Sequence, residues 1–437
     1  MLHSRFLAAL WLAAACGAQT PPAAQAGANP PIKLTLKDAL DRARQYGPQF
    51  LTANIAAQLA HENTVQARAA LLPTVNGLSQ FIYTQPNGSP SGVFVSNDGP
   101  RVYNDQALVH GDIWNPGKRA DYRGAIAAEA VARAKMDVAA RGLFATVAQN
   151  FYAMAVAARK LVHAQQALRE TQDFLAITQK LEQGGEAAHA DVIKAQIQFE
   201  QRQRDLQEAQ LTLDKARIAF AVLLFPDFRQ DFTIDDDLES AQPLPAFPEV
   251  QQLAGRNNPD IRAAQATVQQ QQSAIQSARW ALFPTLSFDY FFGINANQFA
   301  LHNDRGQNNL GSVAQAQLNI PVWTWGATRS KVRQAELQLQ QAKNDLSFTQ
   351  RTLLSELQSF YEEAQVAASQ VASLRLSENQ SAESLRLTIL RYQAGEVTVL
   401  EVVDAESTLI QARNAYDDGL ARYRLALANL QTLTGVF

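Results

Sequence analysis

The 437-residue sequence is poor in the residues that build most disulfide and metal sites. It has one cysteine, Cys16, which excludes a disulfide framework and a cysteine-based metal site. Three methionines and six histidines are too few for a Met-rich or His-rich metal path. Basic residues are not in excess, because 38 Lys and Arg stand against 41 Asp and Glu. The net charge of −3 argues against a protein that binds nucleic acid. No motif suggests a cofactor.

Glycine and proline are also few, at 21 and 17 residues, so most of the chain should form regular secondary structure. No later segment approaches 18 consecutive apolar residues, and the sequence therefore predicts no transmembrane helix. At the N-terminus, Arg5 precedes an apolar run over residues 6–15 that fits the core of a signal peptide. We expect a signal peptide and a flexible N-terminus over residues 1–26.

Two processing sites remain open within that segment. The stretch LAAAC at 12–16 is a weak lipobox, and cleavage there would leave Cys16 lipidated. The stretch AQA at 24–26 is a small-x-small site that would release a chain beginning at Gly27.

The chain repeats itself at an offset of about 210 residues, which is the signature of an internal duplication. LLPT at 71–74 matches LFPT at 282–285, and ADVIKA at 190–195 matches LEVVDA at 400–405. The predicted structural repeats are 34–225 and 249–434. The linker 226–248 between them is rich in proline and acidic residues.

Each repeat is predicted to contain four helices and two strands. The expected helices are 34–46, 48–72, 118–182 and 189–224 in the first repeat, and 249–257, 259–283, 327–393 and 398–434 in the second. The expected strands are 74–84 and 103–113, then 285–294 and 311–321. The 65-residue helix 118–182 would be about 97 Å long, and helices 48–72 and 189–224 together about 92 Å. Two short helices stacked end to end would therefore have about the same length as the one long helix beside them. In the long helices, apolar residues recur at alternating intervals of three and four positions, which favours coiled-coil packing.

The predicted strands have the features of membrane strands. They have the length of strands that cross an outer membrane and mix apolar with polar positions. Aromatic residues of the kind that form girdles at lipid interfaces lie near their ends, namely Trp114, Trp280, Trp323, Trp325, Tyr83 and Tyr290. The polar loops 85–102 and 295–310 fit the outer, water-facing side. Four strands cannot close a barrel in lipid, so the chain should oligomerise, either as two copies with eight strands or as three with twelve.

The duplicated plan, the LLPT and LFPT junctions and YQAGEVTVLEVVDAE at 392–406 resemble the TolC family of outer-membrane efflux channels. The resemblance covers about residues 34–434. It implies a mainly α fold with membrane β: a trimeric 12-stranded β-barrel, four strands per chain, continuous with a long periplasmic α-helical barrel. It also implies a homotrimer in the outer membrane that docks to a periplasmic adaptor and an inner-membrane pump of the RND or ABC type.

The resemblance also assigns roles to residues at the helix breaks. Gly184, Gly185 and Gly395 would form hairpin turns at the periplasmic tips, where the adaptor binds, because glycine tolerates the positive φ of such turns. Glu401 and Asp404 lie on one helix face and, with Asp191 of the first repeat and Tyr392, would form a periplasmic gate with a ring of carboxylates that attracts cations. An arginine that latches the gate in the family is replaced here by Val397.

Three functions compete at this point. The first is a passive exit duct of a tripartite efflux or type I secretion system. The second is a periplasmic coiled-coil adaptor, although such a protein would have one hairpin and not a duplicated plan. The third is an enzyme, but the sequence has no nucleophile elbow and no phosphate-binding loop. The sequence leaves the cargo and the class of pump open.

Overall fold

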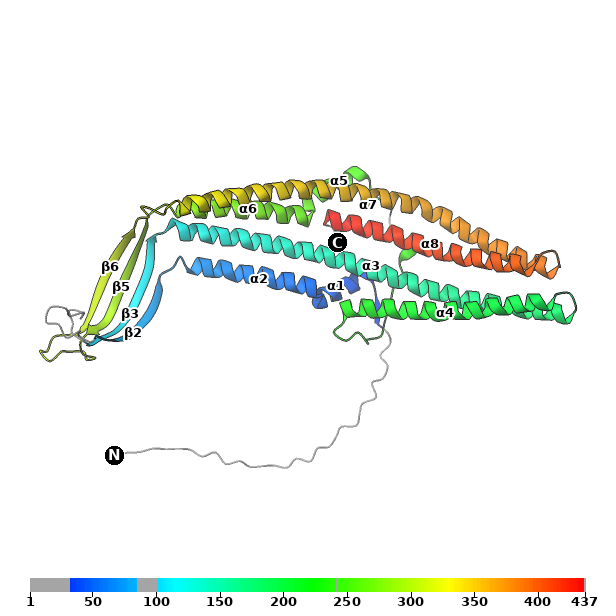
Figure 1. The fold of residues 1–437 in the computed structure, drawn as a ribbon, viewed down its shortest axis with the longest axis horizontal. Coiled ribbons are helices and arrows are strands. Elements are labelled where there is room, and N and C mark those ends of the chain that lie inside the picture. The colour runs from blue at the N-terminus through cyan, green and yellow to red at the C-terminus, as the bar shows by residue number, and fades with distance from the viewer. Residues whose placement is uncertain (1–31, 85–100, 241–242, 436–437) are drawn as a thin grey trace, which may run out of the picture.

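The computed structural model describes residues 32–84, 101–240 and 243–435 (Figure 1). The proposed signal segment with Cys16 and most of the loop 85–102 lie outside these residues. The predicted elements appear in the predicted order, and their bounds differ by at most three residues. The first repeat contains α1 (Leu36–Tyr46), α2 (Pro48–Ala69), β2 (Thr74–Tyr83), β3 (Arg101–Trp114), α3 (Pro116–Gln183) and α4 (His189–Leu224). The second contains α5 (Phe247–Asn257), α6 (Pro259–Trp280), β5 (Thr285–Ala296), β6 (Leu310–Asn319), α7 (Ala327–Gln393) and α8 (Val399–Thr434).

The elements form an elongated molecule with the strands at one end and the α3–α4 and α7–α8 turns at the other (Figure 1). Helices α2 and α4 follow one another along α3, and α6 and α8 follow one another along α7 (Figure 1). The arrangement agrees with the matched helix lengths. Among the described helices, none is both long enough and apolar enough to cross a membrane.

The linker between the repeats is more ordered than its composition predicts. It contains β4 (Phe232–Ile234), which pairs in parallel with β1 (Ile32–Leu34), and the short 3₁₀ turn Leu238–Ser240. The prediction that a helix begins at residue 34 is wrong, because Leu34 belongs to β1 and Thr35 caps α1 through its hydroxyl and Asp38. Strands of three residues show no measurable periodicity, so only the tertiary pairing reveals them.

The largest apolar core lies near the middle of the molecule, where this small sheet meets α3 and α4. Phe151 of α3 packs edge to face against Phe220 of α4, with 6.3 Å between ring centroids, and both are fully buried. Arg159 of α3 then ties the linker to α8, since its Nη1 lies 3.2 Å from Glu239 Oε1 and 3.1 Å from Asp417 Oδ1. Asp417 is almost completely buried, so these contacts fix the linker against both repeats.

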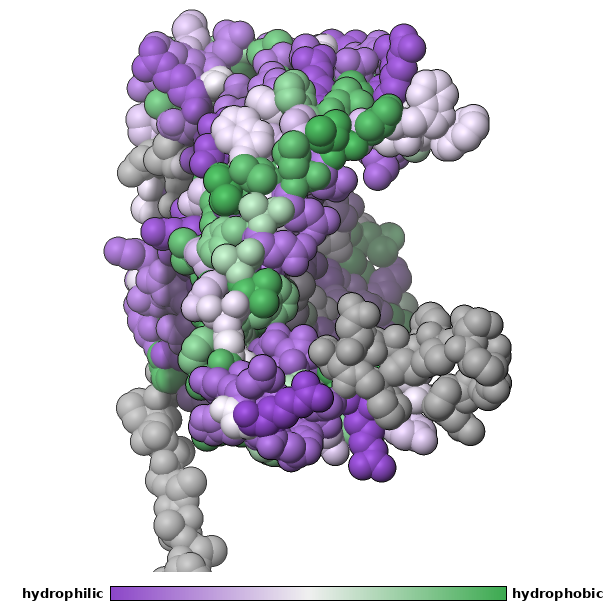
Figure 2. Space-filling model, turned by 90° about the vertical axis from the view of Figure 1, so that its left-hand side faces the viewer, coloured by the Kyte–Doolittle hydropathy of each residue, from purple (hydrophilic) through white to green (hydrophobic). Residues whose placement is uncertain are grey.

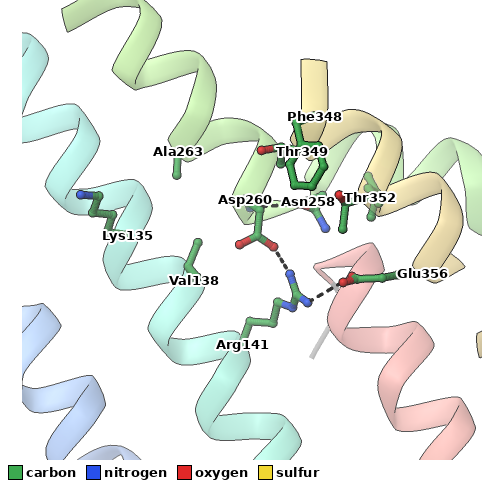
Figure 3. Close-up of a pocket in the computed structure, with 11 residues that line it drawn as sticks. Lys135, Val138, Arg141, Asn258, Asp260, Ala263, Phe348, Thr349, Thr352 and Glu356 are labelled. Atoms are coloured by element: carbon green, nitrogen blue, oxygen red, sulfur yellow. Dashed lines mark hydrogen bonds and ion pairs between the residues drawn. The ribbon is translucent and has the colours of Figure 1, made fainter. Parts of the chain in front are cut away.

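A second polar link joins the repeats closer to the strands (Figure 3). Arg141 of α3 donates a hydrogen bond to Asp260 at the start of α6 and lies 3.9 Å from Glu356 of α7. Asn258 caps α6 from the same cleft, which has a volume of about 420 Å³. One cation of the first repeat thus faces two anions of the second.

The two strand pairs form one sheet in the order β2-β3-β5-β6, with every pair antiparallel. The hairpin of each repeat therefore supplies half of the sheet, and β3 and β5 join the halves. Strands β2 and β6 are the edges, and every residue of β6 is exposed in the single chain. Long exposed edges of this kind are templates for pairing with another chain.

Candidate channel and gate

The four-stranded sheet separates apolar side chains from polar ones. On β5, one face carries Leu286, Phe288, Tyr290, Phe292 and Ile294, because successive side chains alternate between the two faces. The register places Leu318, Ala316 and Ala314 of β6 beside the first three. Seen onto this end, the molecule shows a hydrophobic strip with hydrophilic surface on both sides (Figure 2). Membrane strands place such a face toward lipid.

The opposite face of the sheet is mainly polar. It carries Asn104, Gln106 and His110 on β3, and Asp289 and Asn295 lie on the same face of β5. His110 and Asp289 are paired across the strands, with 2.6 Å between Nδ1 and Oδ1. A polar face of this kind lines the lumen of a membrane barrel.

The aromatic residues near the strands lie in two groups. All four predicted tryptophans are at the helix end of the sheet: Trp114 ends β3, Trp280 ends α6, and Trp323 and Trp325 lie between β6 and α7. Trp323 and Trp325 are 73% and 89% exposed, with their rings 5.8 Å apart. Tyr83 ends β2 at the other end, whereas Tyr290 lies in the middle of β5.

The second group, at the loop end, contains Phe81 and Phe299, which the sequence analysis did not single out. Phe81 packs on Tyr103 at 4.9 Å, and Tyr103 packs on Phe299 at 6.0 Å between centroids. Phe299 follows β5 by three residues, so its place in this group depends on the loop conformation.

At the far end, both helical hairpins turn through the same backbone motif. Gly395 has φ 75°, its N–H donates to the Tyr392 carbonyl, and the Glu396 N–H donates to the Arg391 carbonyl. Gly185 has φ 80°, and the matching bonds run from Gly185 to Glu182 and from Glu186 to Leu181. This pair of bonds with a left-handed glycine is the Schellman motif. Gly184 instead has helical φ and ψ, so only the second glycine of the pair needs to be glycine for the turn.

The predicted acids lie just beyond these turns. Glu401 and Asp404 are exposed on the first turns of α8, and the Glu401 carboxylate accepts a hydrogen bond from the Thr398 N–H at 3.3 Å. Asp191 occupies the matching turn of α4 and is half-buried, with Lys194 at 3.9 Å. The structure of one chain therefore places all three carboxylates at the hairpin end.

Tyr392 is buried, unlike the exposed carboxylates of Glu401 and Asp404. It is buried in an apolar cluster that joins the two hairpins, and its ring lies 5.2 Å from that of Phe174. Burial raises the pKa of Tyr392, the Thr178 hydroxyl opposes this, and the charge of Asp191 adds to it. Val397 packs against the same cluster. The residue at the place of the family's arginine thus contributes apolar contact between the hairpins.

A buried ionic cluster farther along the hairpins was not predicted. Glu406 of α8 is 3% exposed, accepts a hydrogen bond from Thr171 of α3, and lies 3.3 Å from Arg202 Nε of α4. Arg413 of α8 approaches Glu170 of α3 at 3.4 Å nearby. The sequence does place charged residues on the inner faces of these helices. Such residues are expected to be paired when buried, but the sequence does not show which residues pair with one another.

Comparison with known proteins decides the family. The model of the outer membrane efflux protein family matches residues 39–224 and 250–436, one match for each repeat. The chain belongs to the outer membrane efflux protein family. The resemblance to TolC and the internal duplication are therefore confirmed.

Several relatives match this efflux channel over most of its length. It is 25% identical to the pyoverdine export outer membrane protein OpmQ of Pseudomonas putida, over 98% of this chain and 91% of that protein. It is 22% identical to the outer membrane protein TolC of Vibrio cholerae, over 92% and 90% of the two chains.

Solved structures share its fold. The CmeC outer membrane channel of Campylobacter jejuni superimposes with a TM-score of 0.78 over 92% of this chain and 86% of that one, at 17% identity. The open state of the MtrE channel of Neisseria gonorrhoeae gives 0.76 over 92% and 88%, at 22% identity.

The chain is thus an outer-membrane efflux or secretion channel with a periplasmic helical extension. The adaptor alternative finds no support among these matches. The family consists of transport channels and is not known as an enzyme family. Channels of this family work as trimers with a periplasmic adaptor and an inner-membrane pump.

Proposed function

We propose that three copies of this chain form a homotrimer whose sheets close into one barrel in the outer membrane. The observation that carries the proposal is the open sheet, whose edges at β2 and β6 pair with no other strand in the described part of the chain and which has one apolar face. Unpaired strand edges are not tolerated in lipid, so β6 of one copy must pair with β2 of the next. Three chains with four strands each give twelve strands, an even number as such barrels require.

We further propose that the helices continue the barrel as a periplasmic tunnel that ends at the hairpin tips. Gly185 and Gly395 would present the tips to a periplasmic adaptor, and the adaptor would connect the tunnel to an inner-membrane pump of the RND or ABC type. Glu401, Asp404 and Asp191 would surround the entrance as a ring of carboxylates. Relatives are named for pyoverdine export, protease secretion and cation efflux, which suits a duct whose cargo is chosen by its pump.

Cross-linking between the sheet edges tests the trimer. Neither processing route leaves a free thiol in the mature chain, so Asn76→Cys on β2 and Val313→Cys on β6 would supply the only two. A short thiol-specific linker should give covalent dimers and trimers in outer membranes. A matched control with Leu108→Cys on the inner strand β3 in place of Asn76→Cys should not.

Channel activity tests the duct itself. The purified protein should run as a heat-resistant trimer in detergent and give single-channel conductance in planar bilayers. A soluble monomer without conductance would overturn the proposed function.

A further inference from the structure

Among the rows of the polar face that span all four strands, one is mainly apolar. The register pairs Asn76 of β2 with Leu108 of β3, Leu108 with Phe291 of β5, and Phe291 with Val313 of β6. Paired residues in antiparallel strands point to the same face. Three of the four side chains at this level are therefore apolar on a face that is otherwise mainly polar. Val313 is 57% exposed in the single chain.

The row on the helix side is polar and acidic. It contains Thr74, His110, Asp289 and Gln315, paired in the same way. Asp289 is held by His110 at 2.6 Å, and its side chain is 17% exposed. A carboxylate thus lies one row away from the Phe291 ring on the same strand and face.

The next row toward the loops has little side-chain bulk beside the apolar row. Gly293 of β5 and Gly311 of β6 are paired there, beside Gln106 of β3. Two adjacent glycines place no side chain next to Phe291 and Val313. Leu78 of β2 occupies the fourth position of this row and lies diagonal to Leu108.

We propose that Leu108, Phe291 and Val313 form an apolar ring in the lumen of the trimer, which binds amphipathic organic cations briefly as they pass. The inference rests on the proposed trimer, in which three chains would supply nine such side chains. An aromatic face attracts cations, and an apolar surface in water binds the apolar part of a molecule. The carboxylate of Asp289 in the neighbouring row favours a positive charge beside the apolar side chains.

Two cations of equal charge and different apolar surface provide the test. Tetraphenylphosphonium and tetramethylammonium would be added in turn to the outer side of single full-length channels in planar bilayers, away from the acidic tips. Tetraphenylphosphonium should interrupt the current with a residence time at least about tenfold longer than tetramethylammonium. The double variant Phe291→Asn with Val313→Asn should shorten that residence time about tenfold, which corresponds to roughly 1.4 kcal/mol.

Control variants separate the ring from the fold. Phe291→Leu keeps an apolar side chain and should retain most of the block, whereas Gln315→Asn in the polar row should change nothing. Equal residence times for the two cations in the unmodified channel, or a double variant that blocks normally, would overturn the apolar ring and leave the conducting trimer intact. Absence of any conductance would instead overturn the trimer and the ring together.

Discussion

Arg202 of α4 and Glu406 of α8 form an ion pair with 3.3 Å between Nε and Oε1, although they lie 204 positions apart in the chain. Their side chains are only 11% and 4% exposed. Because α4 and α8 belong to different repeats, this pair holds the two hairpins of one chain together. Any opening of the tunnel that moves one hairpin against the other would have to break it.

Removal of the cation should destabilise this contact strongly. Arg202→Met leaves the Glu406 carboxylate buried without its partner, and loss of one partner of a buried pair costs about 3–5 kcal/mol. We expect a loss of this order in the opening free energy measured by amide hydrogen exchange at Thr171 and Glu406 in the detergent-solubilised protein.

Arg204→Met is the matched control, because Arg204 is exposed on the same helix and donates a hydrogen bond to Gln201 at 2.7 Å, within α4 itself. The double variant Arg202→Met with Glu406→Leu should recover most of the lost protection, since no charge stays buried. Equal losses in Arg202→Met and Arg204→Met would contradict the role of the pair.

The pH dependence of the same contact follows from Glu406. Burial raises the pKa of Glu406 above its usual value of 4.5, Thr171 and Arg202 oppose the shift, and Glu170 adds to it. A carboxyl whose pKa is higher in the folded protein contributes stability that is fully present below the unfolded pKa. This stability is lost as the pH rises through the folded pKa.

We therefore expect the local opening free energy of the hairpin contact to fall as the pH rises above about 4.5, relative to the Glu406→Gln variant. Hydrogen exchange corrected for the intrinsic rate at each pH measures this difference. Asp205, Glu170 and Arg413 surround the site in both proteins and cancel in the comparison. A contact that strengthens with rising pH would show that the Arg202 charge outweighs burial.

The glycines of the hairpin turns differ in backbone conformation, so alanine substitutions at the adjacent Gly184 and Gly185 can be compared directly. Gly185→Ala and Gly395→Ala would each force a side chain into a left-handed backbone, at a cost of about 1–2 kcal/mol, although among the described residues only the adjacent ones lie within 4 Å of the new methyl group. Gly184→Ala, at φ −78°, should be neutral or slightly stabilising. Hydrogen exchange at the tip amides would measure both, and an equal effect at Gly184 and Gly185 would refute the assignment of the turn.

The acids at the tip should control block by cations. Glu401→Gln with Asp404→Asn removes six carboxylates from a trimer, two from each of three chains. The glutamine can still accept the hydrogen bond from Thr398 and so preserves the helix cap. We expect block of the channel current by a trivalent cation, added on the tip side, to weaken at least about tenfold.

Glu396→Gln is the control for this experiment, because Glu396 is exposed at the same tip but is paired with Arg391 at 3.4 Å. An unchanged block in the double variant would remove the carboxylate ring from the proposed gate.

The parts of this structure that local chemistry specifies were predicted closely. Pro48 and Pro259 begin α2 and α6, as proline does at the first helical position. The positive φ at Gly185 and Gly395 needs glycine irrespective of the surroundings. By contrast, the three-residue strands β1 and β4 have no local signature, since each pairs with a strand about 200 residues away.

By itself, the sequence determined the duplication, the order of helices and strands, the two hairpin breaks and the family, because these depend on local backbone preferences and on similarity along the chain. The tertiary structure decided which charged residues form pairs and which side chains lie in the same row of the sheet. Arg202 finds Glu406 only when two helices pack, and Leu108, Phe291 and Val313 fall in one row only through the register of three strands. A shift of one residue in that register would turn the apolar side chains of the shifted strand to the opposite face of the sheet.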